Sequence, residues 1–142
     1  MARGNRLRDD AAMSIESTLQ GYREAWAAGD LERIVAAYHE DFVLHYFGES
    51  PLAGTHTGKE AALTILGQAT RRSERELVEV SDVLAGAEMG ALVAVERLGP
   101  ERRECRRLLL YKVRDDKLAE CWLYDEDQRF VDGLWSTPAT GT

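Results

Sequence analysis

Apolar positions recur with a helical period in the first half of the chain and with strand character in the second half. Over residues 14–28 they fall at i, i+4, i+7 and i+11, which predicts one buried stripe on a helix. Its members are Ile15, Leu19, Tyr22 and Trp26. Gly29 is placed to end this helix and Asp30 to cap the next one.

The segment after Asp30 predicts a second helix, a strand and a third helix. The second helix carries Leu31, Ile34, Val35 and Tyr38. The stretch "FVLHYF" (42–47) has the composition of a strand, and "GESPLAG" after it has the composition of a turn. Gly58 precedes the third helix, which we place at 59–70.

Beyond the third helix the pattern predicts four strands and one short helix. Short connections such as "GAEMG", "GPE" and "RDD" separate the strands, which favours an antiparallel meander. The strands span 74–85, 90–98, 102–114 and 117–125, and the last helix spans 127–135. Three helices, a curved antiparallel sheet and a short C-terminal helix predict an α+β fold.

The register of the last hairpin predicts which of its side chains share a face. If Asp115 and Asp116 form the tip, Val113 lies opposite Leu118. One face then holds Arg106, Leu108, Leu110, Cys121, Leu123 and Asp125, and the other holds Arg107, Leu109, Tyr111, Glu120, Trp122 and Tyr124. Because both faces are largely apolar, we expect helices to cover one and a second copy of the chain to cover the other. The predicted homodimer contacts are Leu109, Tyr111, Trp122 and Tyr124.

Composition and charge restrict the class of protein. At 142 residues with 44% apolar content the chain suits one globular domain, which we place at 14–135 between a flexible N-terminal tail (1–13) and a C-terminal tail (136–142). No apolar run is long enough to span a membrane, and the start lacks the apolar segment of a signal peptide, so we expect a cytoplasmic protein. A net charge of −7 argues against nucleic acid and acidic membranes as partners.

Two stretches carry a resemblance to a known family: "GYREAWAAGDLERIVAAYHEDFVLHYFGESPLAGTHTGKEA" and "YKVRDDKLAECWLYDEDQ". They resemble nuclear transport factor 2-like proteins, in the branch with ketosteroid isomerases and SnoaL-like polyketide cyclases, and the resemblance covers residues 14–135. It implies a cone in which a strongly curved, mixed sheet wraps the long first helix and leaves a blind apolar pocket. The fold alone does not determine the activity, because it hosts isomerases, cyclases, hydratases, epoxide hydrolases and non-catalytic binding proteins.

The resemblance also implies roles for particular residues. Isomerases of this branch use a tyrosine on the first helix, which is retained as Tyr22, and two aspartates. The aspartate positions fall at His45 or Tyr46 and near Leu109, so ketosteroid isomerase activity itself is not expected. His45 and Tyr46 point to opposite faces of their strand, and the sequence leaves open which of them lines the pocket. The Arg-x-Asp of limonene-type epoxide hydrolases is absent from "CRRLLLYKV".

Two aspartates near the end of the last strand are further candidates. Asp125 is either a base whose pKa is raised by desolvation or the structural partner of Arg106, and the ion pair is favoured. Asp127 opens the last helix, where an N-cap role is favoured over contact with a ligand. The resemblance places the following further residues at the pocket: Trp26, Tyr46, Arg106, Leu108, Leu110, Cys121 and Leu123.

Several functions are compatible with these residues, and no metal-ligand spacing or phosphate loop predicts a cofactor. The first is an isomerase or cyclase acting on an apolar, carbonyl-bearing metabolite, with Tyr22 as hydrogen-bond donor and His45 or Asp125 as base. The second is a ligand-binding or assembly module without turnover. A hydrolase that opens an epoxide or lactone with Asp125 and Arg106 ranks below both.

Overall fold

The computed structural model describes the backbone of residues 2–136 and the side chains of residues 14–136. The elements follow one another as α1 (Ala2–Ala28), α2 (Leu31–Ala36), β1 (Tyr38–Tyr46), β2 (Gly54–Thr57), α3 (Lys59–Ser73), β3 (Glu76–Ala85), β4 (Met89–Leu98), β5 (Arg103–Arg114), β6 (Lys117–Asp125) and α4 (Gln128–Trp135). The backbone of residues 2–13, for which the sequence predicts a flexible tail, is therefore helical and continuous with the rest of α1. The predicted C-terminal tail lies outside the described residues, apart from Ser136.

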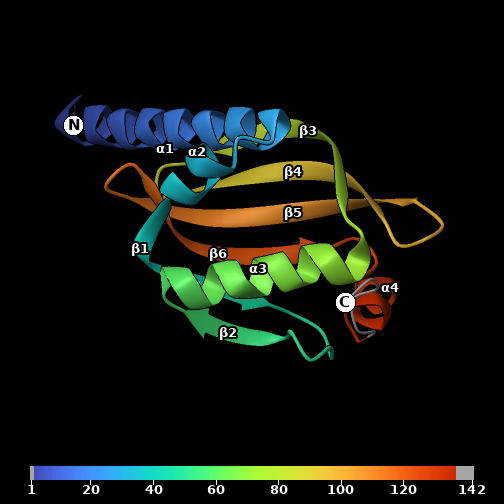
Figure 1. Cartoon of the computed structure of the whole chain (residues 1–142). Coiled ribbons are helices and arrows are strands. Elements are labelled where there is room, and N and C mark those ends of the chain that lie inside the picture. Colours follow the sequence, from blue (N-terminus) through green and yellow to red (C-terminus); the bar gives the residue numbers. More distant parts are fainter. Residues whose placement is uncertain (1, 137–142) are drawn as a thin grey trace.

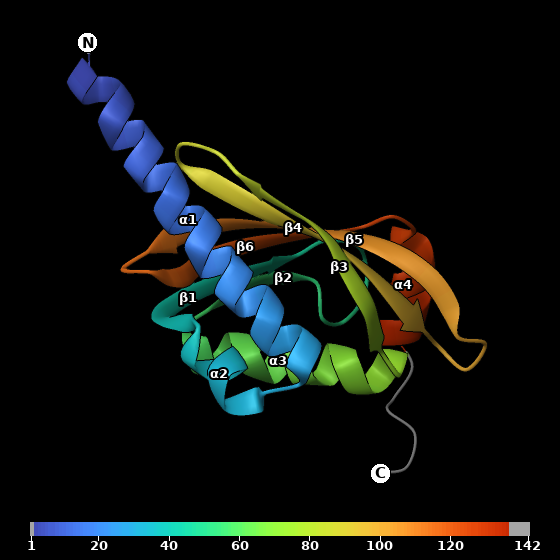
Figure 2. The same ribbon diagram turned by 90° about the horizontal axis from the view of Figure 1, so that it is seen from above.

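The strands form one open, curved sheet with the order β2-β1-β6-β5-β4-β3. β1 pairs with β6 in parallel, and the other neighbours are antiparallel. α1 packs against β3 and β4, whereas α3 packs against β1 and β2. Figures 1 and 2 show both helices on the same side of the sheet, with β5 and β6 running between them. This is the predicted α+β cone.

The local signals at the helix ends are confirmed. Gly29 has a φ of +65°, a left-handed conformation that suits glycine and ends α1. The Asp30 side chain accepts a hydrogen bond from Arg33 N at 3.2 Å and caps α2. Asp127 likewise accepts from Phe130 N at 3.1 Å, so the favoured N-cap role is confirmed.

The prediction for the chain after α2 is wrong in one respect that matters for the site. The second helix ends at Ala36, and Tyr38 begins β1 instead of continuing the helix. No residue of α2 is buried, so this short helix gains little by extension. Tyr38 instead pairs with Leu118 of β6 and is 4% exposed. The predicted turn, residues 48–54, is followed by a short edge strand, β2, which the sequence pattern does not predict.

The predicted register of the last hairpin holds only at its tip. Val113 pairs with Leu118 as expected, but Lys112 pairs with Glu120, so Ala119 is an extra residue on β6. Such a bulge reverses the facing of every later β5 residue relative to β6. Arg106, Leu108 and Leu110 therefore point outward and not into the pocket. Leu109 and Tyr111 point inward, are buried, and do not belong to a dimer surface.

Candidate functional site

A cavity of about 500 Å³ lies over the concave face of the sheet, between α1, α2 and α3. Its volume lies within the range of small-molecule sites. Among the lining residues, Leu31 and Val35 of α2 and Thr70 and Arg71 of α3 are exposed, so the mouth lies between these two helices. The structure thus contains a pocket where the resemblance implies one.

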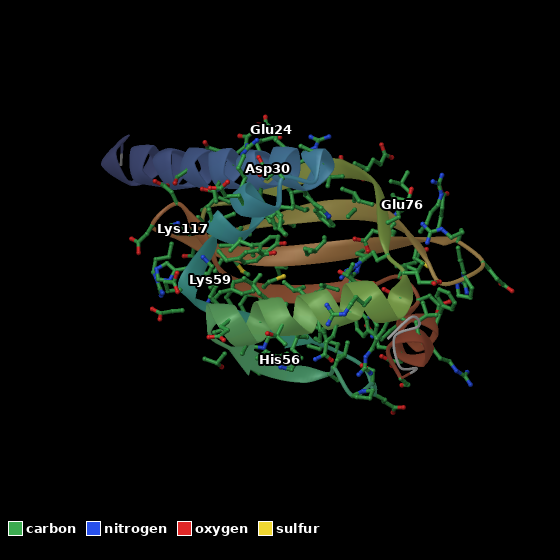
Figure 3. The ribbon with its side chains drawn as sticks, in the orientation of Figure 1. Glu24, Asp30, His56, Lys59, Glu76 and Lys117 are labelled. Carbon is green, nitrogen blue, oxygen red and sulfur yellow. The ribbon has the colours of Figure 1, made fainter. Side chains whose placement is uncertain are left out.

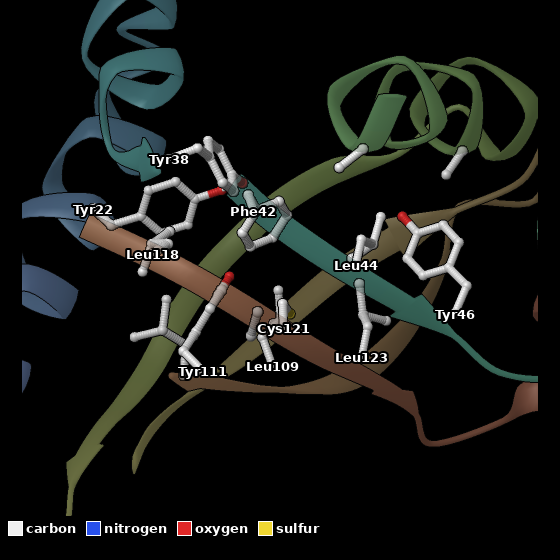
Figure 4. Close-up of a cluster of buried hydrophobic side chains, with 14 of the residues drawn as sticks. Tyr22, Tyr38, Phe42, Leu44, Tyr46, Leu109, Tyr111, Leu118, Cys121 and Leu123 are labelled. Atoms are coloured by element: carbon white, nitrogen blue, oxygen red, sulfur yellow. The ribbon is translucent and has the colours of Figure 1, made fainter. Parts of the chain in front are cut away.

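The floor of the cavity is mostly apolar and comes from β1, β5 and β6. Phe42, Leu44, Leu109, Cys121 and Leu123 line it, and each is at most 5% exposed. Figure 4 shows these side chains between Tyr22, Tyr38 and Tyr111 on one side and Tyr46 on the other. A dry apolar floor strengthens any polar interaction made beside it.

Two tyrosines provide hydroxyl groups at the wall formed by α1 and β1. Tyr22 and Tyr38 share a buried hydrogen bond between their hydroxyls, in which either can donate. Burial raises the pKa of Tyr22 to about 12, so the hydroxyl keeps its proton at neutral pH. Because one hydroxyl of the pair donates to the other, one proton remains that can be donated to a ligand in the cavity.

A charged cluster lies at a second wall, where β4, β5 and β6 meet. Arg107 Nε donates to Asp125 Oδ1 at 2.7 Å, and Arg107 Nη1 donates to Glu96 Oε2 at 3.2 Å. Arg75 Nη1 lies 3.7 Å from the same Glu96 oxygen, and Arg75 Nη2 donates to Thr70 Oγ1 at 2.9 Å. The side chains of Glu96, Arg107 and Asp125 are at most 1% exposed.

Alternation along the strands explains this cluster. Arg107 pairs with Ala94 of β4 and with Asp125 of β6, so Arg107 and Asp125 point to the concave face together. Glu96 lies two residues from Ala94 on the same face of β4. Three charged side chains thus converge because the bulge at Ala119 brings Arg107, and not Arg106, opposite Asp125.

The two buried carboxyl groups, Glu96 and Asp125, differ in their hydrogen-bond partners and in their access to the cavity. Burial raises the pKa of both Glu96 and Asp125 to about 7, although the Arg75 charge opposes the rise. Both oxygens of Asp125 accept from Arg107, and Asp125 does not line the cavity. Glu96 lines the cavity, and its Oε1 has no hydrogen-bond partner among residues 14–136. Glu96 is therefore the carboxyl group that can contact a ligand.

The structure brings some of the predicted pocket residues together and separates others. Tyr22, Trp26, Cys121 and Leu123 all line the cavity. Tyr46 faces inward but stacks on Trp135, with ring centroids 4.7 Å apart, and lies outside the lining. The favoured ion pair of Asp125 exists, but its partner is Arg107 and not Arg106.

His45 lies on the opposite face of the sheet from the cavity. Its ring stacks on Trp122 with a centroid distance of 5.0 Å, and Nε2 lies 2.6 Å from Glu120 Oε2. Nδ1 lies 3.0 Å from Thr55 Oγ1 on β2. A second histidine, His56, lies on β2 itself (Figure 3), where its ring nitrogen Nε2 hydrogen-bonds the Leu52 carbonyl oxygen. The choice that the sequence left open between His45 and Tyr46 is thus decided for Tyr46 as the inward residue.

Sequence reasoning missed seven polar residues that line the cavity: Tyr38, Thr70, Arg71, Arg75, Glu96, Arg107 and Tyr111. The sequence does contain a signal for Glu96. In the strand "ALVAVERL" this acidic residue occupies one of the alternating positions whose other members are apolar and point inward. The sequence pattern places Tyr38 on a helix, and the predicted register turns Arg107 outward. Arg75 follows a run of charged residues that resembles a solvated surface.

The described part of the chain contains neither a metal-binding cluster nor a membrane-spanning helix. Within it, no group of three or more His, Cys, Asp or Glu side chains is arranged to hold a metal ion. None of its helices combines the length and the apolar character that crossing a bilayer requires.

Comparisons with known proteins give a consistent result for the fold. A sequence model of the SnoaL-like domain matches residues 19–121. A search of curated proteins finds no match. Among solved structures, the chain is similar to a Xanthomonas campestris protein of unknown function with a cystatin-like fold, at 21% identity and a TM-score of 0.76, over 85% of this chain and 97% of that one.

Two other solved structures support the same conclusion. Bal32a, from a soil-derived mobile gene cassette, has 19% identity and a TM-score of 0.73, over 88% of this chain and 98% of its own. A nuclear transport factor 2-like protein from Burkholderia xenovorans LB400 has 24% identity and a TM-score of 0.66, over 89% and 98%.

Proposed function

Because the chain belongs to the SnoaL-like domain family, within the nuclear transport factor 2-like superfamily, we propose that its cavity binds an apolar, carbonyl-bearing metabolite and transfers a proton on it. The reaction would be that of an isomerase or a cyclase. The observation that carries this proposal is one apolar cavity lined by both the Tyr22–Tyr38 pair and Glu96 with its unpartnered oxygen.

Glu96 has the properties of a general base in this reaction. A base is most effective when its pKa lies near the working pH, and burial raises the pKa of Glu96 to about 7. Arg107 and Arg75 both approach Oε2, which leaves Oε1 directed to other partners. This division of the two oxygens fixes the carboxyl group while keeping one oxygen available to the substrate.

The proposed step moves one proton and one electron pair. Glu96 Oε1 removes a proton from a carbon conjugated with the substrate carbonyl, and the C–H electrons move towards the carbonyl oxygen. A tyrosine hydroxyl of the Tyr22–Tyr38 pair donates a hydrogen bond to that oxygen as it gains negative charge. Return of the proton to another carbon completes an isomerisation. In a cyclisation the enolate carbon attacks a second carbonyl, and the oxygen of that carbonyl takes the proton back from Glu96.

Solvent deuterium exchange into a panel of apolar ketones tests this proposal. Glu96→Gln keeps the shape of the side chain but cannot accept the proton, and we expect exchange to fall by about 10²- to 10⁴-fold. Tyr22→Phe should also slow it, because the hydroxyl pair is lost. His45→Gln, on the far face of the sheet, is the control and should leave the rate unchanged. An unchanged rate in both cavity variants would refute the catalytic assignment.

The same experiment distinguishes catalysis from a binding function without turnover. A ketone that raises the melting temperature but takes up no deuterium would identify a non-catalytic ligand-binding module. Glu96 would then serve to recognise a hydrogen-bond donor on the ligand.

The row Glu96–Arg107–Asp125 favours one further candidate, a hydrolase that opens an epoxide or lactone. In this reaction Glu96 would take a proton from water while the water oxygen attacks the ring carbon. The ring C–O bond would break, its oxygen would take a proton from a tyrosine hydroxyl, and the proton held by Glu96 would then restore that hydroxyl. Incorporation of ¹⁸O from labelled water into the product would identify this reaction, whereas an isomerase incorporates none.

We also propose that the outer face of the sheet forms a homodimer contact, with corrected residues. Trp122 and Tyr124 stay on this face, and Leu108 and Leu110 take the places of Tyr111 and Leu109. Leu108 and Tyr124 are 37% and 42% exposed, which is high for large apolar side chains. Leu108→Glu should convert a dimer to a monomer in sedimentation velocity without loss of the fold; a parent that is already monomeric would exclude the contact.

A further inference from the structure

The charge on the cavity wall differs in sign from the charge on the chain as a whole. The protein carries a net charge of −7, yet the charged residues lining the cavity are three arginines and one carboxylate: Arg71, Arg75, Arg107 and Glu96. Arg107 is neutralised from behind by Asp125, whose two oxygens it binds. Arg71 and Arg75 therefore leave excess positive charge beside Glu96.

The two arginines near the mouth have unused donors. The Arg71 guanidinium makes no hydrogen bond or ion pair with the described side chains, although it lines the cavity. The Arg75 guanidinium donates to Thr70 Oγ1 and also interacts with the Tyr46 hydroxyl, and its approach to Glu96, at 3.7 Å, is longer than a hydrogen bond. An arginine of this kind presents several N–H groups that fit a carboxylate.

The two lips of the mouth differ in character. On the α2 side Leu31 is 71% exposed and Val35 is 36% exposed, so that lip is apolar. On the α3 side Thr70 and Arg71 form a polar, basic lip. An amphipathic molecule with one negative end matches both lips, since its chain can pass Leu31 while its charged end reaches Arg71.

We infer that the cavity takes organic acids: molecules with an apolar body on the floor and one carboxylate at the mouth, on Arg71 and the nearer donors of Arg75. A single negative charge matches Arg71, the one cavity-lining guanidinium that has no hydrogen-bond or ion-pair partner among residues 14–136. Arg75, whose Nη1 lies 3.7 Å from Glu96 Oε2, offsets the repulsion between Glu96 and the carboxylate of the ligand. This inference refines the substrate class of the proposed function and rests on its assignment of the cavity as the ligand site.

Titration calorimetry with decanoic acid and 1-decanol at pH 8 tests this inference. The two probes share the chain and differ in the head group, and the acid is the less apolar of the two. We expect decanoate to bind the parent protein at least ten times more tightly than 1-decanol. Equal affinities, tighter binding of the alcohol, or no binding of either probe would overturn the inference.

Variants identify the arginine responsible. Arg71→Gln should weaken decanoate binding about threefold to tenfold and leave 1-decanol unchanged, and Arg71→Lys should retain part of the difference. Arg129→Gln is the matched control, because Arg129 is exposed on α4, outside the cavity lining, and its loss changes the net charge equally. Equal weakening by Arg71→Gln and Arg129→Gln would overturn the inference, since it would reflect the overall charge only.

The inference and the proposed catalysis can fail separately. If only the catalysis fails, decanoate binds as expected but no ketone exchanges deuterium.

Discussion

The two faces of the β5–β6 hairpin place the same kinds of side chain in opposite surroundings. Arg107 and Arg106 are neighbours on β5, yet the Arg107 side chain is 1% exposed and that of Arg106 is 67% exposed. Arg107 binds two buried carboxyl groups, whereas Arg106 lies 4.0 Å from the exposed Glu126. The comparison shows that facing, and not residue type, makes an ionic group in this sheet part of a site.

The acidic partners differ in the same way. Glu96 lies in the cavity wall, and one of its oxygens has no hydrogen-bond partner among residues 14–136, whereas the Glu120 side chain is 26% exposed and contacts His45 on the outer face. Both residues lie on central strands of one sheet. Only the inner one combines burial with access to an enclosed volume, which is what acid–base chemistry on an apolar molecule requires.

The largest contrast is expected from the two neighbouring arginines. Arg107→Met leaves Glu96 and Asp125 buried without their shared guanidinium, and breaking a buried ion pair costs about 3–5 kcal/mol. Arg106→Met removes only an exposed, loosely paired charge, so the change should stay within about 0.5 kcal/mol. Urea denaturation at pH 7 measures both. Similar losses in the two variants would contradict the register described for this hairpin.

The second contrast concerns pH. The pKa of Glu96 is about 7 in the folded protein and 4.5 ordinarily, so between these values the unfolded chain releases a proton that the folded chain keeps. Stability contributed by the neutral carboxyl group is thus complete at low pH and is lost as pH rises through 7. Asp125 acts in the same direction, because its pKa is also raised to about 7.

Glu96→Gln isolates this effect, since the amide resembles the protonated acid at every pH. We expect the variant to match the parent at pH 4 and to exceed it by about 1–3 kcal/mol at pH 8, measured by urea denaturation across the range. Glu120→Gln on the outer face serves as the comparison and should show no such divergence. Parallel curves for Glu96→Gln and the parent would mean that folding does not raise the pKa of Glu96.

The sequence was sufficient for the fold because that depends on patterns that many residues share. The apolar stripe of α1, the break at Gly29 and the short strand connections each indicate the same α+β fold. The site depends on single events. One extra residue, Ala119, exchanges the faces of Arg106 and Arg107, and one early helix end moves Tyr38 onto β1 beside Tyr22. Neither event leaves a local sequence signal, because both arise from pairing between distant strands.

A third, smaller contrast separates the tyrosines. Tyr38→Phe removes one member of the buried hydroxyl pair and leaves Tyr22 Oη without its partner, at an expected cost of about 1–3 kcal/mol. Tyr124 is 42% exposed on the outer face, so Tyr124→Phe should cost less than about 0.5 kcal/mol. Thermal unfolding of both variants measures the difference. A neutral Tyr38→Phe would indicate that water replaces the lost hydroxyl.

The smallest effect is expected for the contact between His45 and Glu120 on the outer face. His45 Nε2 and Glu120 Oε2 lie 2.6 Å apart, but the two side chains are 20% and 26% exposed, so solvent weakens their interaction. A double-mutant cycle of His45→Ala and Glu120→Ala should give a coupling below about 1 kcal/mol, whereas the corresponding cycle for Arg107 and Asp125 should give several times more. The comparison is informative because the outer pair has the shorter contact of the two, 2.6 Å against 2.7 Å. If the outer pair nevertheless coupled as strongly as the inner one, burial would not be what distinguishes the two faces. If its coupling grew with protein concentration, the outer pair would instead lie within a dimer contact that excludes water from it.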